Sequence, residues 1–290
     1  MSIFVQTIFN SLEMGGVYAL ATMGVILIFR TSSAFNYAQG VISMFCAFFA
    51  AWALSETGMN VWLATGLGLL AALTVGIIID RVVISRTINL HSVSKQIITL
   101  GLVIVFLGLA PMLFGNDPFQ FPRFFHGSES IAGANITHST IFNILIGIAI
   151  MGVLFFIIQK TKWGLAVRAT ASNGIVARMM GIPTPIVTMG AWAIAAALGT
   201  LAAIMLAPTT GVRLEMMNAV QIYALLACVL GGLGTFHGPV IAAYIIAFAR
   251  NFTAFYISNE WSDVIVFLLI LGVLLIAPNG IFGKKIVKKV

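Results

Sequence analysis

Charge is scarce in this chain. Asp, Glu, Lys and Arg make up only 8% of its 290 residues, whereas 60% of the residues are hydrophobic. A soluble domain carries about 25% charged residues, so the composition leaves little room for one. The net charge of +7 comes from basic residues in short connections between apolar runs, a pattern that does not point to nucleic acid as a partner. The sequence predicts an all-α fold, a polytopic helical membrane protein with a single transmembrane domain over residues 1–290.

Signatures of catalysis and of metal or nucleotide binding are missing as well. The phosphate-binding pattern GxxxxGK[ST] does not occur, no serine lies in a nucleophile elbow, and the four histidines lack the spacing of metal ligands. Cys46 and Cys228 lie inside apolar runs, where we expect small buried side chains rather than a disulfide or a metal site. We therefore expect a protein without cofactor, metal or enzymatic activity of its own.

Paired acids inside the apolar segments, which a proton-driven carrier would need, are absent too. Glu13 is the one acid that we place well inside a segment, and we favour a position near the outer interface for it. Arg250 is the corresponding basic residue, and we expect it to reach the outer surface by snorkelling. A transport protein with neither an acid relay nor an ATP site would draw its energy from a partner.

Apolar segments of spanning length follow one another along the whole chain. Because a membrane-spanning helix needs about 20 residues, we count eight or nine spans. One segment ends in Gly231, Gly232 and Gly234 and is therefore a candidate for a short or broken helix. The expected spans are 5–29, 36–54, 61–80, 96–114, 139–158, 186–208, 217–235, 239–257 and 263–278.

The connections between these spans alternate in charge. Basic residues fill the connections 81–95 and 160–178 and the C-terminal tail, which should therefore be cytoplasmic. Acidic residues are more frequent in the remaining connections, among them the loop 115–138, which should face outward. Nine spans with an outside N-terminus and a cytoplasmic C-terminus satisfy all of these assignments.

Lys160–Pro185 is the longest stretch in which positive charge recurs between two strongly apolar segments. Its two arginines, Arg168 and Arg178, would cost about 2.5–3.5 kcal/mol each in the hydrocarbon. We therefore place the loop 159–185 in the cytoplasm. As a short helix that stops at Gly181, it would present an apolar face, with Ala177 on it, to a cytoplasmic partner. The alternative is a positive membrane-surface loop without a partner.

Several short motifs occur in a characteristic order over nearly the whole chain. Each is weak alone, but the ordered set resembles the permease subunits of branched-chain amino-acid ABC importers, most closely those of the LivH type. Related permeases for urea, amides and simple sugars share part of the set, so these substrates stay open. The motifs are Gly16–Leu20 (GVYAL), Asn36–Gly40 (NYAQG), Trp163–Ala169 (WGLAVRA), Gly181-Ile182, Gly231–Gly234 (GGLG) with Gly238, and Pro278–Gly283 (PNGIFG).

The resemblance implies a multi-pass subunit of the bacterial inner membrane. It would pair with a second, LivM-like permease, two cytoplasmic ATPase subunits and a periplasmic amino-acid-binding protein. The segment matching Gly164–Gly181 docks on the ATPase in this family. Two positions depart from the family pattern, because Val176 and Val41 stand where many relatives carry charge. The resemblance assigns the ATPase-coupling role to six residues in or next to this segment, namely Arg168, Ala169, Asn173, Ala177, Gly181 and Ile182.

The function that follows is half of a translocation path for a small amino acid, with a branched-chain amino acid as the first candidate. If specificity comes mostly from the binding protein, the path needs few polar contacts. Interhelical hydrogen bonding is the alternative role for such polar residues. A stand-alone secondary carrier or channel, and an integral-membrane enzyme, are the rival functions. The residues that we expect to line the path are Tyr18, Asn36, Gln39, Thr209 and Tyr223.

Overall fold

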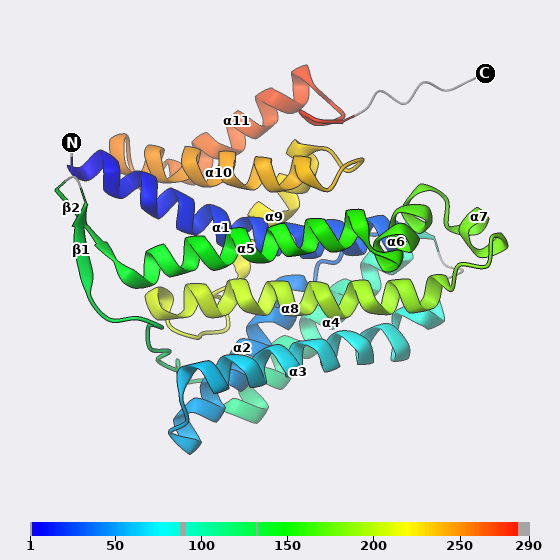
Figure 1. Cartoon of the computed structure of the whole chain (residues 1–290), viewed down its shortest axis with the longest axis horizontal. Coiled ribbons are helices and arrows are strands. Elements are labelled where there is room, and N and C mark those ends of the chain that lie inside the picture. Colours follow the sequence, from blue (N-terminus) through cyan, green and yellow to red (C-terminus); the bar gives the residue numbers. More distant parts are fainter. Residues whose placement is uncertain (1, 88–90, 132, 284–290) are drawn as a thin grey trace.

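The computed structural model describes residues 2–87, 91–131 and 133–283. Its long helices lie side by side, with the N-terminus and a β-hairpin at one end and two short helices, α6 and α7, at the other (Figure 1). In chain order the elements are α1 (Ser2–Ser32), α2 (Gln39–Thr57), α3 (Val61–Val82), the 3-10 helix η1 (Ile84–Thr87), α4 (Ser92–Phe114), β1 (Ser128–Ile131), β2 (Ala134–Thr137), α5 (His138–Lys160), α6 (Lys162–Ser172), α7 (Gly174–Met179), α8 (Thr184–Thr210), α9 (Asn218–Gly231), α10 (His237–Tyr256) and α11 (Ser262–Ile276). The predicted fold class is confirmed.

Within the described residues, seven helices are long and apolar enough to cross a membrane, namely α1 to α5, α8 and α10. Two further apolar helices, α9 and α11, have only 14 and 15 residues. At 1.5 Å per residue, α9 rises about 21 Å, less than the roughly 30 Å of bilayer hydrocarbon. The prediction that the segment 217–235 holds a short helix is therefore confirmed.

The centre of the bundle is formed by α1 and α8. They pack against each other, α1 also contacts α5, α9 and α10, and α8 also contacts α2 and α3. Most of α1 and α8 is buried, whereas most residues of α4 and α5 are exposed or only half-buried within this chain. The outer helices therefore have apolar faces for lipid or for a partner in the membrane.

Small residues bring the central helices close together. A Cβ at Gly76 in α3 would lie 2.7 Å from the carbonyl oxygen of Trp192 in α8, and a Cβ at Gly199 in α8 would collide with Ser43 in α2. Such contacts replace the hydrophobic driving force, which is weak between helices in lipid. Both cysteines are buried and free, as the sequence predicts.

The loop 115–138 contains a feature that the sequence did not predict, the antiparallel hairpin of β1 and β2 with Ser128 opposite Thr137. Nearby, the Phe119 N–H donates to the Val212 carbonyl at 3.1 Å and the Val212 N–H donates to the Phe119 carbonyl at 2.9 Å. These two bonds join the loop to the connection between α8 and α9. The apolar runs are helical, so the strands are confined to the polar loop.

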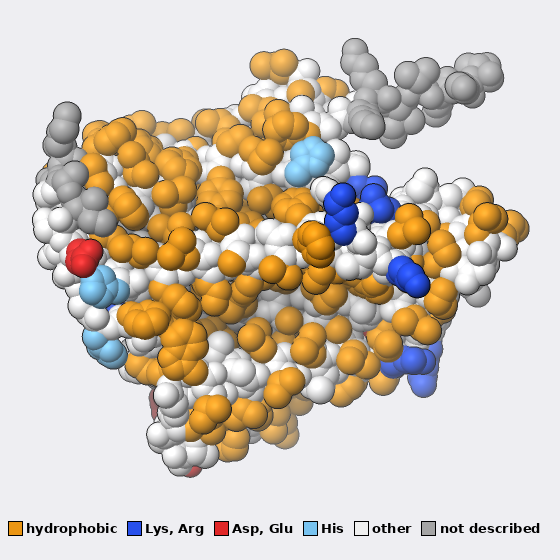
Figure 2. Space-filling model, viewed as in Figure 1, with side chains coloured by type: hydrophobic (Ala, Val, Ile, Leu, Met, Phe, Trp, Pro, Cys, Tyr) orange, Lys and Arg blue, Asp and Glu red, His pale blue; other side chains and the backbone are white. Residues whose placement is uncertain are grey.

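On the face shown in Figure 2, the charged side chains differ between the two ends of the bundle. Lys and Arg gather over the end with α6 and α7, an acidic side chain and histidines lie at the hairpin end, and hydrophobic side chains cover much of the face between them (Figure 2). The predicted basic tail, with Lys284, Lys285, Lys288 and Lys289, lies outside the described residues.

Candidate functional site

A polar cluster lies in the interior where the chain passes from α1 into α2. Asn36 and Gln39 are buried, and Asn36 Nδ2 donates to Gln39 Oε1 at 3.2 Å. Gln39 Nε2 donates to the carbonyl oxygen of Ala195, near the middle of α8, at 2.5 Å. Asn36 Oδ1 accepts from the Ala38 N–H at 3.0 Å, which helps to turn the chain into α2. The helix therefore begins in the interior of the bundle rather than at its surface.

Gln221, in the first turn of α9, completes this cluster. Its Oε1 accepts from the Gly40 N–H at 2.6 Å, and its Nε2 donates to the Asn36 carbonyl at 3.2 Å. The starts of α2 and α9 therefore meet at the depth of the middle of α8, which accounts for the short α9. Sequence reasoning missed Gln221, although a glutamine inside an apolar segment was a signal. Discontinuous helices that meet near the middle of the membrane are typical of transport sites.

Tyr18 and Tyr223 form a second buried contact, between α1 and α9, with ring centroids 5.0 Å apart. The Tyr223 hydroxyl donates to Asp263 and accepts from Arg250 Nε at 3.1 Å. Arg250 Nε also contacts Asp263 Oδ1 at 2.9 Å. The last predicted span, 263–278, begins at Asp263, and the sequence gave Arg250 no partner, whereas the structure pairs these two residues across α10 and α11.

The fifth predicted path residue, Thr209, lies apart from the other four. It is exposed near the end of α8 and lines a pocket of about 30 Å³ together with Glu13 and Asn143. Glu13 accepts hydrogen bonds from Thr140 Oγ1 at 2.9 Å and from Asn143 Nδ2 at 2.6 Å. Because α5 begins at His138, Glu13 lies near the hairpin end, in agreement with a place near the interface. That these five residues line a path stays a prediction.

No group of three or more His, Cys, Asp or Glu side chains that could hold a metal ion occurs in the part of the chain that the structure describes. A single acid, Asp80, is buried at the end of α3, and its Oδ1 has no hydrogen-bond partner there. Sequence reasoning took Asp80 as the last residue of a span. One isolated carboxylate does not make the paired relay of a proton-driven carrier.

The loop 159–185 folds as two helices rather than one. Thr161 Oγ1 accepts from the Gly164 N–H at 3.1 Å and caps α6. A Cβ at Gly164 would collide with the carbonyl oxygens of Ile157 and Ile158. Only glycine therefore lets α6 fold back so closely against the end of α5.

Asn173 separates the two helices. Its backbone is extended, with φ at −158°, and its Oδ1 accepts from the N–H groups of Ile175 and Val176, both at 3.1 Å. This capping begins α7. Gly181 follows α7 with φ at +82°, in the left-handed region that favours glycine. Two of the six predicted coupling residues, Asn173 and Gly181, thus shape the segment itself.

The other four coupling residues differ in exposure. Arg168 is exposed, and Ala169 and Ile182 are half-buried. Ala177 is only 4% exposed, because α7 turns this side chain toward the rest of the chain. The placement of Ala177 on the outward apolar face is therefore wrong. A short helix has an inner and an outer face, and the sequence does not show which one a small residue takes.

The outward face of α7 carries large apolar side chains instead. Ile175, Val176, Met179 and Met180, which we call the α7 patch, are 64%, 50%, 80% and 78% exposed. In Figure 1, α7 projects from the end of the bundle, away from the long apolar helices. Large apolar side chains grouped on a projecting element are typical of a surface that binds a partner.

Arg168 lines a groove of about 680 Å³ where the end of α5 meets α6. Arg30 and Lys160 add positive charge to this groove, and none of its lining residues is acidic. Arg30 is held in place, because it donates to the Gly234 carbonyl and its guanidinium lies 4.7 Å from the centroid of the Phe236 ring. The groove therefore complements an acidic group.

Two of the glycine motifs meet at the same end of the bundle. Gly231, the last residue of α9, faces Gly238 in the first turn of α10, and a Cβ on either one would collide with backbone of the other. The motif Pro278–Gly283 folds back onto this crossing, where the Ile281 N–H donates to the Leu230 carbonyl at 2.8 Å. Gly280, with φ at +83°, lies against Gly232. These two motifs therefore build one tight junction rather than two separate turns.

Comparison with known proteins decides the family. The model of the family described as "Branched-chain amino acid transport system / permease component" matches residues 7–274. The chain belongs to this family. The resemblance inferred from the ordered motifs is therefore confirmed.

Individual relatives of this permease family cover most of the chain. The high-affinity branched-chain amino acid transport system permease protein LivH of Escherichia coli K12 is 28% identical, over 99% of this chain and 98% of its own length. The corresponding permease protein BraD of Pseudomonas aeruginosa is also 28% identical, with the same two coverages. The fructose import permease protein FruF of Bifidobacterium longum is 26% identical over 81% of this chain and 66% of its own length. No solved structure matches the chain.

Proposed function

We propose that this chain is the permease subunit of an ATP-driven importer and forms half of a translocation path for a branched-chain amino acid. The observation that carries the proposal is the likeness to LivH and BraD over 99% of the chain. The interior also fits a transport role, because α2 and α9 begin beside the cluster of Asn36, Gln39 and Gln221. An opening of the two helix starts would expose this cluster.

The partners follow from what the chain does not contain. An ATP-binding pattern does not occur in its sequence, and so hydrolysis belongs to separate subunits. We propose that two cytoplasmic ATPase subunits dock on α6 and α7 and that a second, LivM-like permease covers the exposed apolar helices. A periplasmic binding protein would deliver the amino acid at the hairpin end.

We propose an inner-membrane orientation with the N-terminus outside and α6, α7 and the C-terminus in the cytoplasm. The gathering of Lys and Arg at one end supports it (Figure 2). A reporter that is active only in the cytoplasm should give signal when fused after Lys162 or Lys289 and none when fused near Glu129. The opposite pattern would overturn the orientation.

Uptake by the assembled importer tests the function. We expect leucine to enter proteoliposomes that hold the permease pair, the ATPases and ATP, with the binding protein on the opposite side. A proton or sodium gradient without ATP should drive no uptake. Transport by this chain alone on such a gradient would establish a secondary carrier instead, and uptake of fructose, urea or an amide without uptake of leucine would move the substrate class to that compound.

A further inference from the structure

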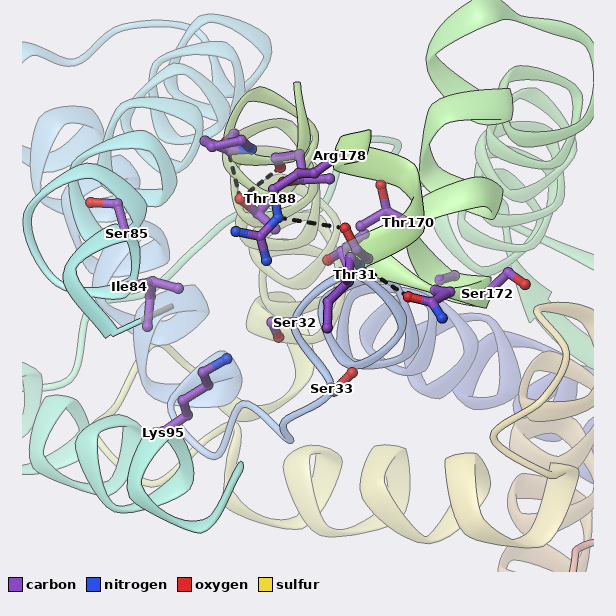
Figure 3. A pocket seen from close by; sticks show the side chains of 16 residues that line it. Thr31, Ser32, Ser33, Ile84, Ser85, Lys95, Thr170, Ser172, Arg178 and Thr188 are labelled. Atoms are coloured by element: carbon purple, nitrogen blue, oxygen red, sulfur yellow. Dashed lines mark hydrogen bonds between the residues drawn. The ribbon is translucent and has the colours of Figure 1, made fainter. Parts of the chain in front are cut away.

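A second polar cavity lies at the α7 end, and the coupling residue Asn173 and Ile175 of the α7 patch are among the residues that line it. This cavity, which we call the Lys95 pocket, has a volume of about 420 Å³ and lies between α7 and the ends of α1, α4 and α8. Lys95 enters it from α4 and Arg178 from α7 (Figure 3). Eight of its lining residues are Ser or Thr, and none is acidic. Two cations with surrounding hydroxyls and no carboxylate make a site for an anion.

Neither cation of the pocket has an acidic partner among the residues that the structure describes. Lys95 forms no ion pair among the described residues. Arg178 donates only a long hydrogen bond of 3.5 Å, to the Gly174 carbonyl, so that most of its guanidinium remains available. Asp80, at the end of α3, is buried but does not line the pocket.

Thr170 gives an independent indication of a ligand. It lines the pocket from α6, is 7% exposed, and its Oγ1 has no hydrogen-bond partner within the described residues. A buried hydroxyl without a partner costs free energy, and such groups are rare in folded proteins. This oxygen has less than 1 Å² of accessible surface, so a bound acceptor would satisfy the hydroxyl after a small rotation of the side chain toward the pocket.

We propose that the Lys95 pocket binds the phosphate of an anionic phospholipid headgroup. Basic pockets between helices on the cytoplasmic side of a membrane suit such headgroups. Val82, Val93 and Ile186 lie within two positions of lining residues in the sequence and are 52%, 65% and 54% exposed, and we assign the acyl chains to this apolar surface. The choice of the cytoplasmic leaflet rests on the proposed orientation. A bound phosphate would tie α7 to α4 and so hold the coupling segment against the bundle.

The test is lipid binding by the purified full chain in detergent, which needs no transport and so fails independently of the proposed function. Thermal unfolding is followed while dioleoylphosphatidylglycerol, dioleoylphosphatidylcholine or inorganic phosphate is added. We expect phosphatidylglycerol to raise Tm and phosphatidylcholine to have no such effect. Loss of one cation, in Lys95→Gln or Arg178→Gln, should weaken apparent binding about fivefold, and loss of both about thirtyfold.

Two matched controls separate the pocket from general surface charge. Arg86→Gln and Lys162→Gln remove exposed cations that do not line the pocket and should leave lipid binding unchanged. Thr170→Val keeps the side-chain shape, so it should weaken lipid binding without lowering the Tm of the lipid-free protein. If inorganic phosphate raises Tm and the lipid does not, and the effect depends on Lys95 and Arg178 in the same way, the pocket binds free phosphate rather than a lipid headgroup. Equal lipid effects in wild type and pocket variants would overturn the proposal.

Discussion

Gly231→Ala is expected to prevent accumulation of the folded protein in the membrane. The added Cβ would collide with the backbone of Gly238 and Pro239, and backbone atoms in a packed helix start cannot move aside as a flexible side chain does. Overpacking typically costs 1–3 kcal/mol and occasionally more, and we expect about 3 kcal/mol or more here. The motif Pro278–Gly283 packs on the same junction, so that a shift of α9 would also release the chain after α11.

The neighbouring Gly234 offers a matched control in the same connection. A Cβ at Gly234 would have no heavy atom within 4 Å, so Gly234→Ala should leave the protein unchanged. Membrane level and thermal unfolding of the purified variants measure the difference. Equal stability of the two variants would mean that the crossing of α9 and α10 is looser than the structure has it.

Among the described residues, the sequence predicted the seven long helices well, because hydrocarbon imposes a length and a composition on each span, whereas the predicted span 263–278 holds only the short helix α11. The short length of α9 could also be predicted, since the glycines that follow it mark an early end of the helix. The strands in the loop 115–138 could not be predicted, because β1 and β2 are short segments of four residues each, without a long alternating pattern. Local patterns therefore gave the helices but not the polar loop between them.

Contacts between distant residues could not be read from the sequence. Arg250 and Asp263 pair across two helices, and Gln221 binds the backbone of Gly40 across 181 positions of the chain. Each of these residues was visible as a polar group near or inside an apolar segment, but its partner was not. The same limit explains why the burial of Ala177 was not predicted, because this burial depends on how α7 is oriented after the break at Asn173.

The burial of Ala177 changes how docking should be tested. An Asp at this position would bury a charge inside the chain and disturb the segment itself, so it cannot report on a partner. Substitutions on the exposed α7 patch avoid this difficulty. Met179 is 80% exposed, and Met179→Asp removes apolar surface without a change in the interior.

Met179→Asp is therefore expected to insert and fold normally but to lose ATPase subunits during co-purification. Burying one large apolar side chain contributes about 1.5–3 kcal/mol, and an Asp in the same contact would also be desolvated. A loss of 2–3 kcal/mol corresponds to roughly 30- to 150-fold weaker association. Met179→Leu keeps the apolar surface and should retain the ATPase. Arg168→Glu, in the groove that Lys160 also lines, should impair association separately by repelling the acidic group that we expect there, and Lys162→Glu is its control on the same helix. Normal ATPase recovery with both Met179→Asp and Arg168→Glu would remove the docking role from α6 and α7, because the two substitutions change the exposed apolar and charged surfaces on which that role depends.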